Sequence, residues 1–95
     1  MSLNDELTRG AWARQIIDNP IYQEAFDEVE NGIIQKWKDC PIRDQQGAHE
    51  LKLMLKLLGE VKQHIQTVFD TGKMAEIQTE QERKVTQLRK YGIPA

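Results

Sequence analysis

The chain has 95 residues, of which 39% are hydrophobic and 6% aromatic, which suits one small helical domain. Such a domain buries a modest core, so its stability margin is thin unless it oligomerises. The formal net charge of −2 disfavours a general nucleic-acid binder, and the single Cys40 excludes an internal disulfide or a cysteine metal cluster. The first residues lack a signal-peptide pattern and no apolar run is long enough to span a membrane, so we expect a cytosolic protein without membrane contact.

The first predicted element is a helix from about Asn4 to Asp18. Ser2 or Asn4 can cap its N-terminus. Gly10, in the middle, either weakens the helix by about 1 kcal/mol or allows a neighbouring helix to approach closely. Because proline disfavours helical geometry at the residue before it, Asn19-Pro20 should end this helix and begin the next one at a tight corner.

The second predicted helix runs from Pro20 to about Lys38 and is clearly amphipathic. Its apolar face carries Tyr22, Phe26, Val29, Ile33 and Trp37. Its other side is acidic, with Glu24, Asp27, Glu28 and Glu30. Pro41 should end it.

The third predicted helix is capped by Asp44 and should end at Gly72 in the usual C-terminal position. Its residues Leu51, Met54, Leu58, Val61, Ile65 and Val68 are spaced alternately by three and four. Leu53, Leu55 and Leu57 fill the neighbouring faces, so this helix needs cover on several sides.

These elements predict an all-α fold, an antiparallel three-helix bundle built on a long third helix, in residues 1–75. The second helix should run out opposite about residue 63, which leaves Ile65, Val68 and Phe69 for the first helix or for an oligomer contact. Trp12 and Trp37 are expected in the core.

Residues 76–95 are predicted to form a separate, short helical tail. Thr79-Glu80-Gln81-Glu82 has the form of a capping box, and Gly92 with Pro94 is typical of a stop. Val85, Leu88 and Tyr91 are its candidate partner-binding residues, because so short a helix is marginal without a surface to lie on.

We find no pattern that indicates catalysis, a metal or a cofactor, and we expect neither enzyme activity nor a small-molecule substrate. His49 and His64 lie about four turns apart on one helix, and Glu60 with His64 lacks the paired Glu-x-x-His motif of di-iron bundles. Cys40 with His49 could form a nucleophile and base, but an ordinary thiol at a helix end is favoured.

One resemblance concerns residues 7–75. It is carried by Arg9-Gly10, Asn19-Pro20, Ala25-Phe26, Ile33 with Trp37, Pro41 with Arg43-Asp44, Leu51-Lys52-Leu53-Met54-Leu55-Lys56-Leu57-Leu58, and Gly72-Lys73-Met74-Ala75. This string resembles a family of small helical proteins of unassigned function encoded by tailed bacteriophages. The resemblance implies a viral origin, a place in the host cytoplasm or in a virion, and a role in particle assembly.

The sequence therefore predicts a non-enzymatic phage accessory or virion-assembly protein that acts through protein–protein contacts as an oligomer. Two alternatives stay open. One is an inhibitor of a host enzyme or defence protein, in which the acids of residues 24–30 imitate a nucleic-acid backbone. The other is a small nucleic-acid-binding packaging or regulatory subunit that uses the bases of residues 83–90; their dilution by Glu76, Glu80 and Glu82 disfavours it.

Overall fold

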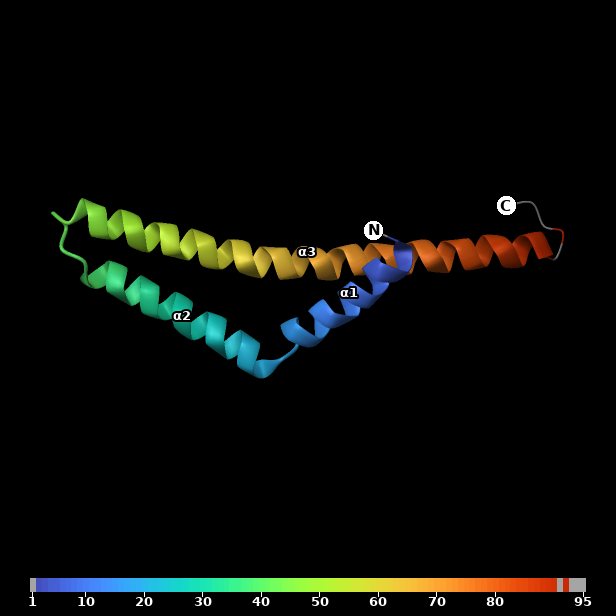
Figure 1. The fold of residues 1–95 in the computed structure, drawn as a ribbon, viewed down its shortest axis with the longest axis horizontal. Coiled ribbons are helices and arrows are strands. Elements are labelled where there is room, and N and C mark those ends of the chain that lie inside the picture. Colours follow the sequence, from blue (N-terminus) through green and yellow to red (C-terminus); the bar gives the residue numbers. More distant parts are fainter. Residues whose placement is uncertain (1, 91, 93–95) are drawn as a thin grey trace.

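The computed structural model describes residues 2–90 and 92, and this part of the chain is helical with no strand. The helices are α1 (Leu3–Ile17), α2 (Pro20–Asp39) and α3 (Gln45–Lys90) (Figure 1). The prediction of an all-α fold built on a long third helix is confirmed, and α1 packs on that helix.

The predicted helix starts are confirmed by their capping hydrogen bonds. The Ser2 hydroxyl accepts from the Asp5 N–H at 3.2 Å, and the Asn19 side chain accepts from the Ile21 N–H at 2.8 Å. Asp44 accepts from the Gly47 N–H at 2.9 Å. Each cap satisfies a backbone donor that the first turn leaves unpaired.

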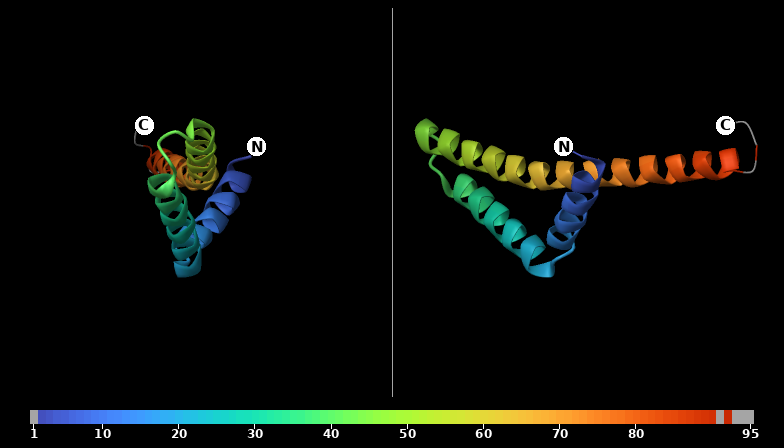
Figure 2. Two further views of the ribbon diagram at one scale, coloured as in Figure 1. Left: turned by 90° about the vertical axis from the view of Figure 1, so that its left-hand side faces the viewer. Right: turned by 45° about the vertical axis from the view of Figure 1, so that its right-hand side comes forward.

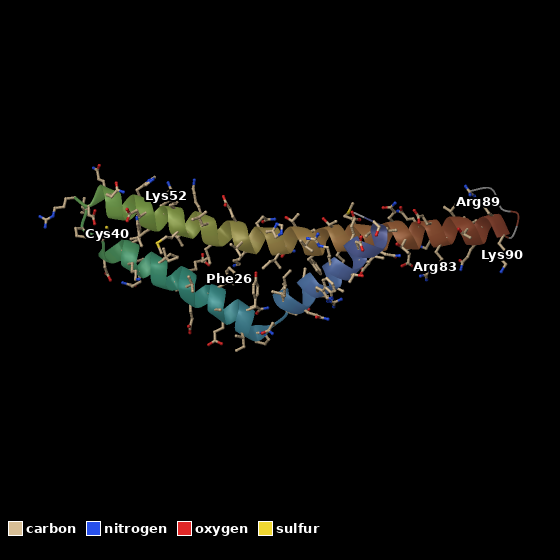
Figure 3. All side chains as sticks on the ribbon, in the orientation of Figure 1. Phe26, Cys40, Lys52, Arg83, Arg89 and Lys90 are labelled. Carbon is tan, nitrogen blue, oxygen red and sulfur yellow. The ribbon has the colours of Figure 1, made fainter. Side chains whose placement is uncertain are left out.

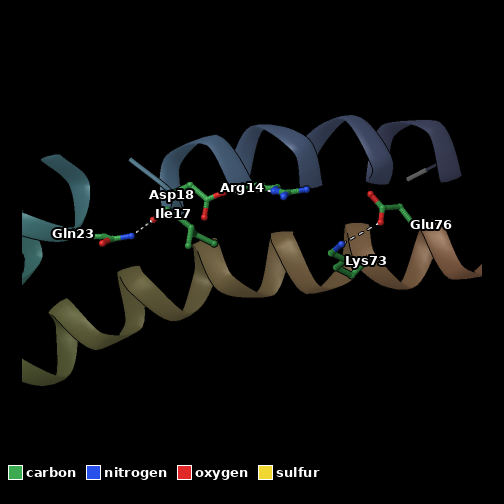
Figure 4. Close-up of polar contacts among 6 residues, drawn as sticks. All are labelled: Arg14, Ile17, Asp18, Gln23, Lys73 and Glu76. Carbon is green, nitrogen blue, oxygen red and sulfur yellow. Dashed lines mark hydrogen bonds and ion pairs between the residues drawn. The ribbon is translucent and has the colours of Figure 1, made fainter. Parts of the chain in front are cut away.

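The corner between α1 and α2 is as tight as the sequence predicts. Only Asp18 and Asn19 separate the two helices. The Gln23 side chain donates to the Ile17 carbonyl at 2.8 Å, and Arg14 pairs with Asp18 at 3.5 Å (Figure 4). The side-chain bond from Gln23 satisfies a carbonyl at the end of α1 and ties the two helices together.

The predicted end of the third helix at Gly72 is wrong, because α3 continues without a break to Lys90. Gly72 is buried inside this helix, and the Thr79 hydroxyl donates to the Ala75 carbonyl at 2.9 Å. Thr79 is therefore an interior residue that bonds back along the helix, and it does not cap a separate tail.

The three helices form an open triangle. α2 and α3 run antiparallel and lie closest near their connecting loop, and α2 then diverges from α3 towards the corner at Pro20 (Figures 1 and 2). α1 returns from the corner to cross α3, and the end of α3 continues past it without a neighbour in the described chain (Figure 1).

The protomer has little core. Among the described residues, the buried apolar side chains are Ala13, Ile33 and Ala75. The radius of gyration is 21.3 Å, against about 12 Å for a compact domain of this length. The molecule extends over 74 × 24 × 19 Å, so its helices have far fewer neighbours than those of a globular bundle.

Candidate interaction surfaces

The best-packed contact in the protomer is the crossing of α1 over α3 at Gly10 and Gly72. A Cβ atom added to Gly72 would lie 2.6 Å from the Gly10 Cα, and one added to Gly10 would lie 2.7 Å from the Gly72 Cα. Ala13 and Ala75 are buried one turn further along the two helices. Small residues thus let the backbones touch, which explains why a glycine persists inside α3 despite its low helix propensity.

The predicted interface residues Ile65, Val68 and Phe69 lie beside this crossing. All three are half-buried. Ile65 and Val68 border a hollow that α1 lines with Trp12 and Ile16, and Phe69 lies beside Leu7 and Gly10. α1 therefore covers part of this surface within the protomer.

The predicted partner-binding residues of the tail lie on the end of α3 that continues past α1. Val85 is half-buried, and Leu88 is exposed. Tyr91 lies outside the described residues. We call residues 80–90 the arm. Ile77, which precedes the arm, lies on the same side of α3 as Val85 and Leu88, and we call these three residues the arm stripe.

Sequence periodicity alone did not reveal which face of α3 stays open. Leu51, Leu55 and Leu58 are half-buried on the side that faces α2. The residues that stay exposed are Leu53, Met54, Leu57 and Val61, which we call the open stripe. About half of the Leu57 and Val61 side chains is accessible, 52% and 53%. The signal was present in the sequence as an excess of leucine around the helix, but only the position of α2 shows which leucines are left.

A further apolar surface lies on α2 and at the corner. Ile21, Ala25 and Val29 follow one another at intervals of four residues and are exposed; we call them the outer strip. Ile21 shares a surface hollow with Trp12 and Ile16, so the outer strip continues onto α1. The expected core positions of Trp12 and Trp37 are wrong, because their exposed fractions are 60% and 53%. Trp12 lies on α1 beside the outer strip, and Trp37 lies in the last turn of α2, so neither indole is enclosed by the packed crossing of α1 over α3.

Another hollow lies between α2 and α3, where the two helices separate. Its lining includes Ile17, Tyr22, Phe26, Gly59 and Lys62. The Tyr22 and Phe26 rings are 4.7 Å apart, and the Lys62 ammonium lies 6.0 Å from the centre of the Phe26 ring (Figure 3 labels Phe26). These aromatic and cation–π contacts hold the side chains that line the hollow, and the hollow itself stays open.

Charge is distributed unevenly along the fold. Residues 20–30 carry four acids and no base, a charge of −4, and residues 83–90 carry four bases and no acid, a charge of +4. The first set lies on α2 and the second on the arm, well apart along the molecule (Figures 1 and 3). Within the described residues, the ion pairs are Arg14–Asp18 and Lys73–Glu76, so neither charged set is paired there.

The residues considered for chemistry do not assemble into a reactive site. Partial burial and the nearby Asp44 carboxylate raise the pKa of the Cys40 thiol, with its sulfur 3.8 Å from Asp44 Oδ2. A raised pKa keeps the sulfur protonated, which is the opposite of what an activated nucleophile needs. His, Cys, Asp and Glu side chains do not gather in groups of three or more anywhere in residues 2–90.

No helix in the described part of the chain is both long enough and apolar enough to cross a bilayer. Comparison with models of protein families, with curated protein sequences and with solved structures finds no match. Evidence for a function therefore comes from the exposed surfaces described above.

Proposed function

We propose that this chain is a non-enzymatic structural protein whose fold is completed by contact with other protein chains, as an oligomer. The observation that carries the proposal is its surface area. The protomer exposes 7783 Å², whereas a compact monomer of 11.0 kDa exposes about 5,600 Å². The excess of about 2,200 Å² matches what one partner contributes to a large, permanent interface.

The character of the exposed surface supports the same proposal. The open stripe, the outer strip and the arm stripe place large apolar side chains in solvent along the length of the molecule. Isolated exposed apolar residues are common, but rows of them at helical spacing are typical of a surface that another helix covers. In the assembly, another chain would then cover the open stripe, which lies on a side of α3 that neither α1 nor α2 covers.

A role as an accessory or virion-assembly protein fits such a chain. The resemblance to small phage proteins suggests the viral context, and the open surfaces suggest a component that is stable only when assembled. The arm and the outer strip also give an assembly subunit two separate places of contact.

Multi-angle light scattering of the full chain tests the proposal. We expect a molar mass that is a multiple of 11.0 kDa at micromolar concentration. The double substitution Leu57→Gln with Val61→Gln should lower that mass, because it makes the open stripe polar. Ile42→Gln is the matched control, since Ile42 is fully exposed in the loop and lies on no stripe. A mass of one protomer at the highest soluble concentration, with a folded circular dichroism spectrum, would overturn the proposal.

A further inference from the structure

We infer that the partner is a second copy of this chain, and that two copies pair through one apolar face on which Trp12 of each copy enters a hollow of the other. This inference rests on the proposed function and adds the identity of the partner, the number of copies and the residues in contact. It starts from two surface hollows that share the side chains of Trp12 and Ile16. One hollow continues to Ile21 of the outer strip, and the other continues to Ile65 of α3. Because the same two side chains line both hollows, α1 joins the outer strip and this part of α3 into one surface.

The open stripe belongs to the same surface. Met54, Leu57 and Val61 are followed by Ile65 and Val68 at intervals of three or four residues, so all five lie on one line along α3. Ile65 and Val68 are half-buried beside α1, whereas the three residues before them are exposed. We call this continuous surface the open face; it consists of the outer strip, Trp12, Ile16, Ile65, Val68 and the open stripe.

Charged residues border the open face and leave its centre apolar. They flank the rows of apolar residues or extend them at their ends, and by helical spacing they are Asp5, Arg9, Glu24, Glu28, Lys36, Glu50 and Glu60. In a two-fold interface, residues near the axis meet their own copies, so a charge at the centre would face a like charge. An apolar centre avoids this repulsion, and salt screens the charges of an exposed rim beyond about 8 Å. The open face therefore suits a second copy of itself.

The centre of the open face carries a projection and a hollow side by side. The Trp12 side chain is 60% exposed. The hollow beside it, between α1 and α3, has a volume of about 240 Å³ and is lined by Ile16, Ile65 and Val68. Such a volume would hold about eight water molecules, so it has room for an indole ring. A two-fold axis beside Trp12 would place each indole in the hollow of the other copy, and large aromatic side chains of this kind are the usual anchors of interfaces.

The area of the open face agrees with that of a stable dimer. Its large apolar residues are exposed by between 43% and 68% of their surface; they are Trp12, Ile16, Ile21, Val29, Leu53, Met54, Leu57 and Val61. An unfolded chain exposes about 1.45 Å² per dalton, so these eight residues together offer about 750 Å². Each partner contributes about 800 Å² to a standard, stable interface. One open face thus supplies the area that one copy needs.

Sedimentation velocity of the full chain tests the inference. Trp12→Gln removes the indole from both copies, and we expect it to raise the Kd of the dimer at least about thirtyfold. Trp37→Gln is the matched control, because Trp37 is exposed to a similar extent, 53%. Trp37 follows the buried Ile33 by four residues and so lies on a different side of α2 from the outer strip. This control should change the Kd by less than about threefold.

Tryptophan fluorescence locates the contact without a polar substitution. The chain has two tryptophans, so Trp37→Phe leaves Trp12 as the single reporter. Its emission should move to shorter wavelength as the protein concentration rises through the Kd, because the indole leaves solvent. In the Trp12→Phe chain, the emission of Trp37 should stay the same at every concentration. Circular dichroism checks that each variant keeps its helix, and the fluorescence result decides if Trp12→Gln loses it.

The outcomes separate this inference from the proposed function. A Trp12→Gln chain that dimerises like the unmodified one, a Trp12 emission that does not change with concentration, or an assembly of more than two copies would overturn the inference and still support the proposed function. An unmodified chain that is monomeric would assign the open face to a different protein, and it would overturn both.

Discussion

Gly10 and Gly72 fix the place where α1 crosses α3. The two backbones are so close there that either glycine would need the other helix to move if it gained a Cβ. We expect Gly72→Ala to lower the free energy of unfolding by about 1–3 kcal/mol, although alanine favours the helix itself. Urea denaturation at fixed protein concentration measures this change.

Gly59 offers the control in the same helix. A Cβ added there meets no atom within 4 Å, so Gly59→Ala should raise the free energy of unfolding by about 0.5–1 kcal/mol. If both alanines stabilised the chain equally, the close crossing of α1 over α3 would be wrong.

Cys40 gives a second prediction for a single residue. Its pKa is raised by partial burial and by the Asp44 carboxylate, so less thiolate is present at a given pH than in a free cysteine. Asp44→Asn keeps a helix-capping side chain but removes the negative charge, and it should therefore lower the pKa of Cys40. Iodoacetamide alkylation followed across pH 7–10 should show the reactive form appearing at lower pH in the variant. An unchanged or higher pKa would show that Asp44 does not act on the thiol.

The continuous α3 is the main finding at the scale of the element, and distances between spin labels test it. Labels at Lys52 and Gln87, in a chain with Cys40→Ser and diluted with unlabelled protein, should lie about 50 Å apart along one straight helix. A helix that ended at Gly72 and restarted near Thr79 would give a clearly shorter or broader distribution by double electron–electron resonance.

Elements with a local signal could be predicted from the sequence, and elements that depend on tertiary contact could not. Ser2, Asn19 and Asp44 act as caps in the structure because capping uses residues only two or three positions away. Gly72 carried the same local signal as a helix end. Its meaning depends on Gly10, about 60 positions earlier in the chain, whose close approach keeps the glycine inside the helix.

The candidate surfaces also divide into features with a local signal in the sequence and features that depend on tertiary contact. Heptad spacing showed that α3 is apolar on several sides, and it correctly indicated a helix with more apolar surface than one short partner covers. It could not show that Leu57 and Val61 lie on a side of α3 that neither α1 nor α2 covers, nor that Trp12 and Trp37 stay in solvent. These outcomes depend on where α1 and α2 pack on α3, and that placement involves residues far apart in the chain, such as Gly10 and Gly72.

At the scale of the whole molecule, the protomer has an extended shape and almost no interior. In the part of the chain that the structure describes, three apolar side chains are buried and two of them are alanines, so they contribute little hydrophobic stabilisation against the entropy of ordering three helices. If the chain assembles as proposed, the remaining stabilisation comes from surface that is exposed in one copy. Folding and association are then coupled, as in dimers that have no stable folded monomer.

The dependence of thermal unfolding on protein concentration tests this central claim most directly. Circular dichroism melts from 1 to 100 μM should show the midpoint rising by about 3 °C for each tenfold increase in concentration, because the folded state is favoured by mass action. A cooperative transition whose midpoint is the same at every concentration would contradict the account, since the protomer would then be stable alone.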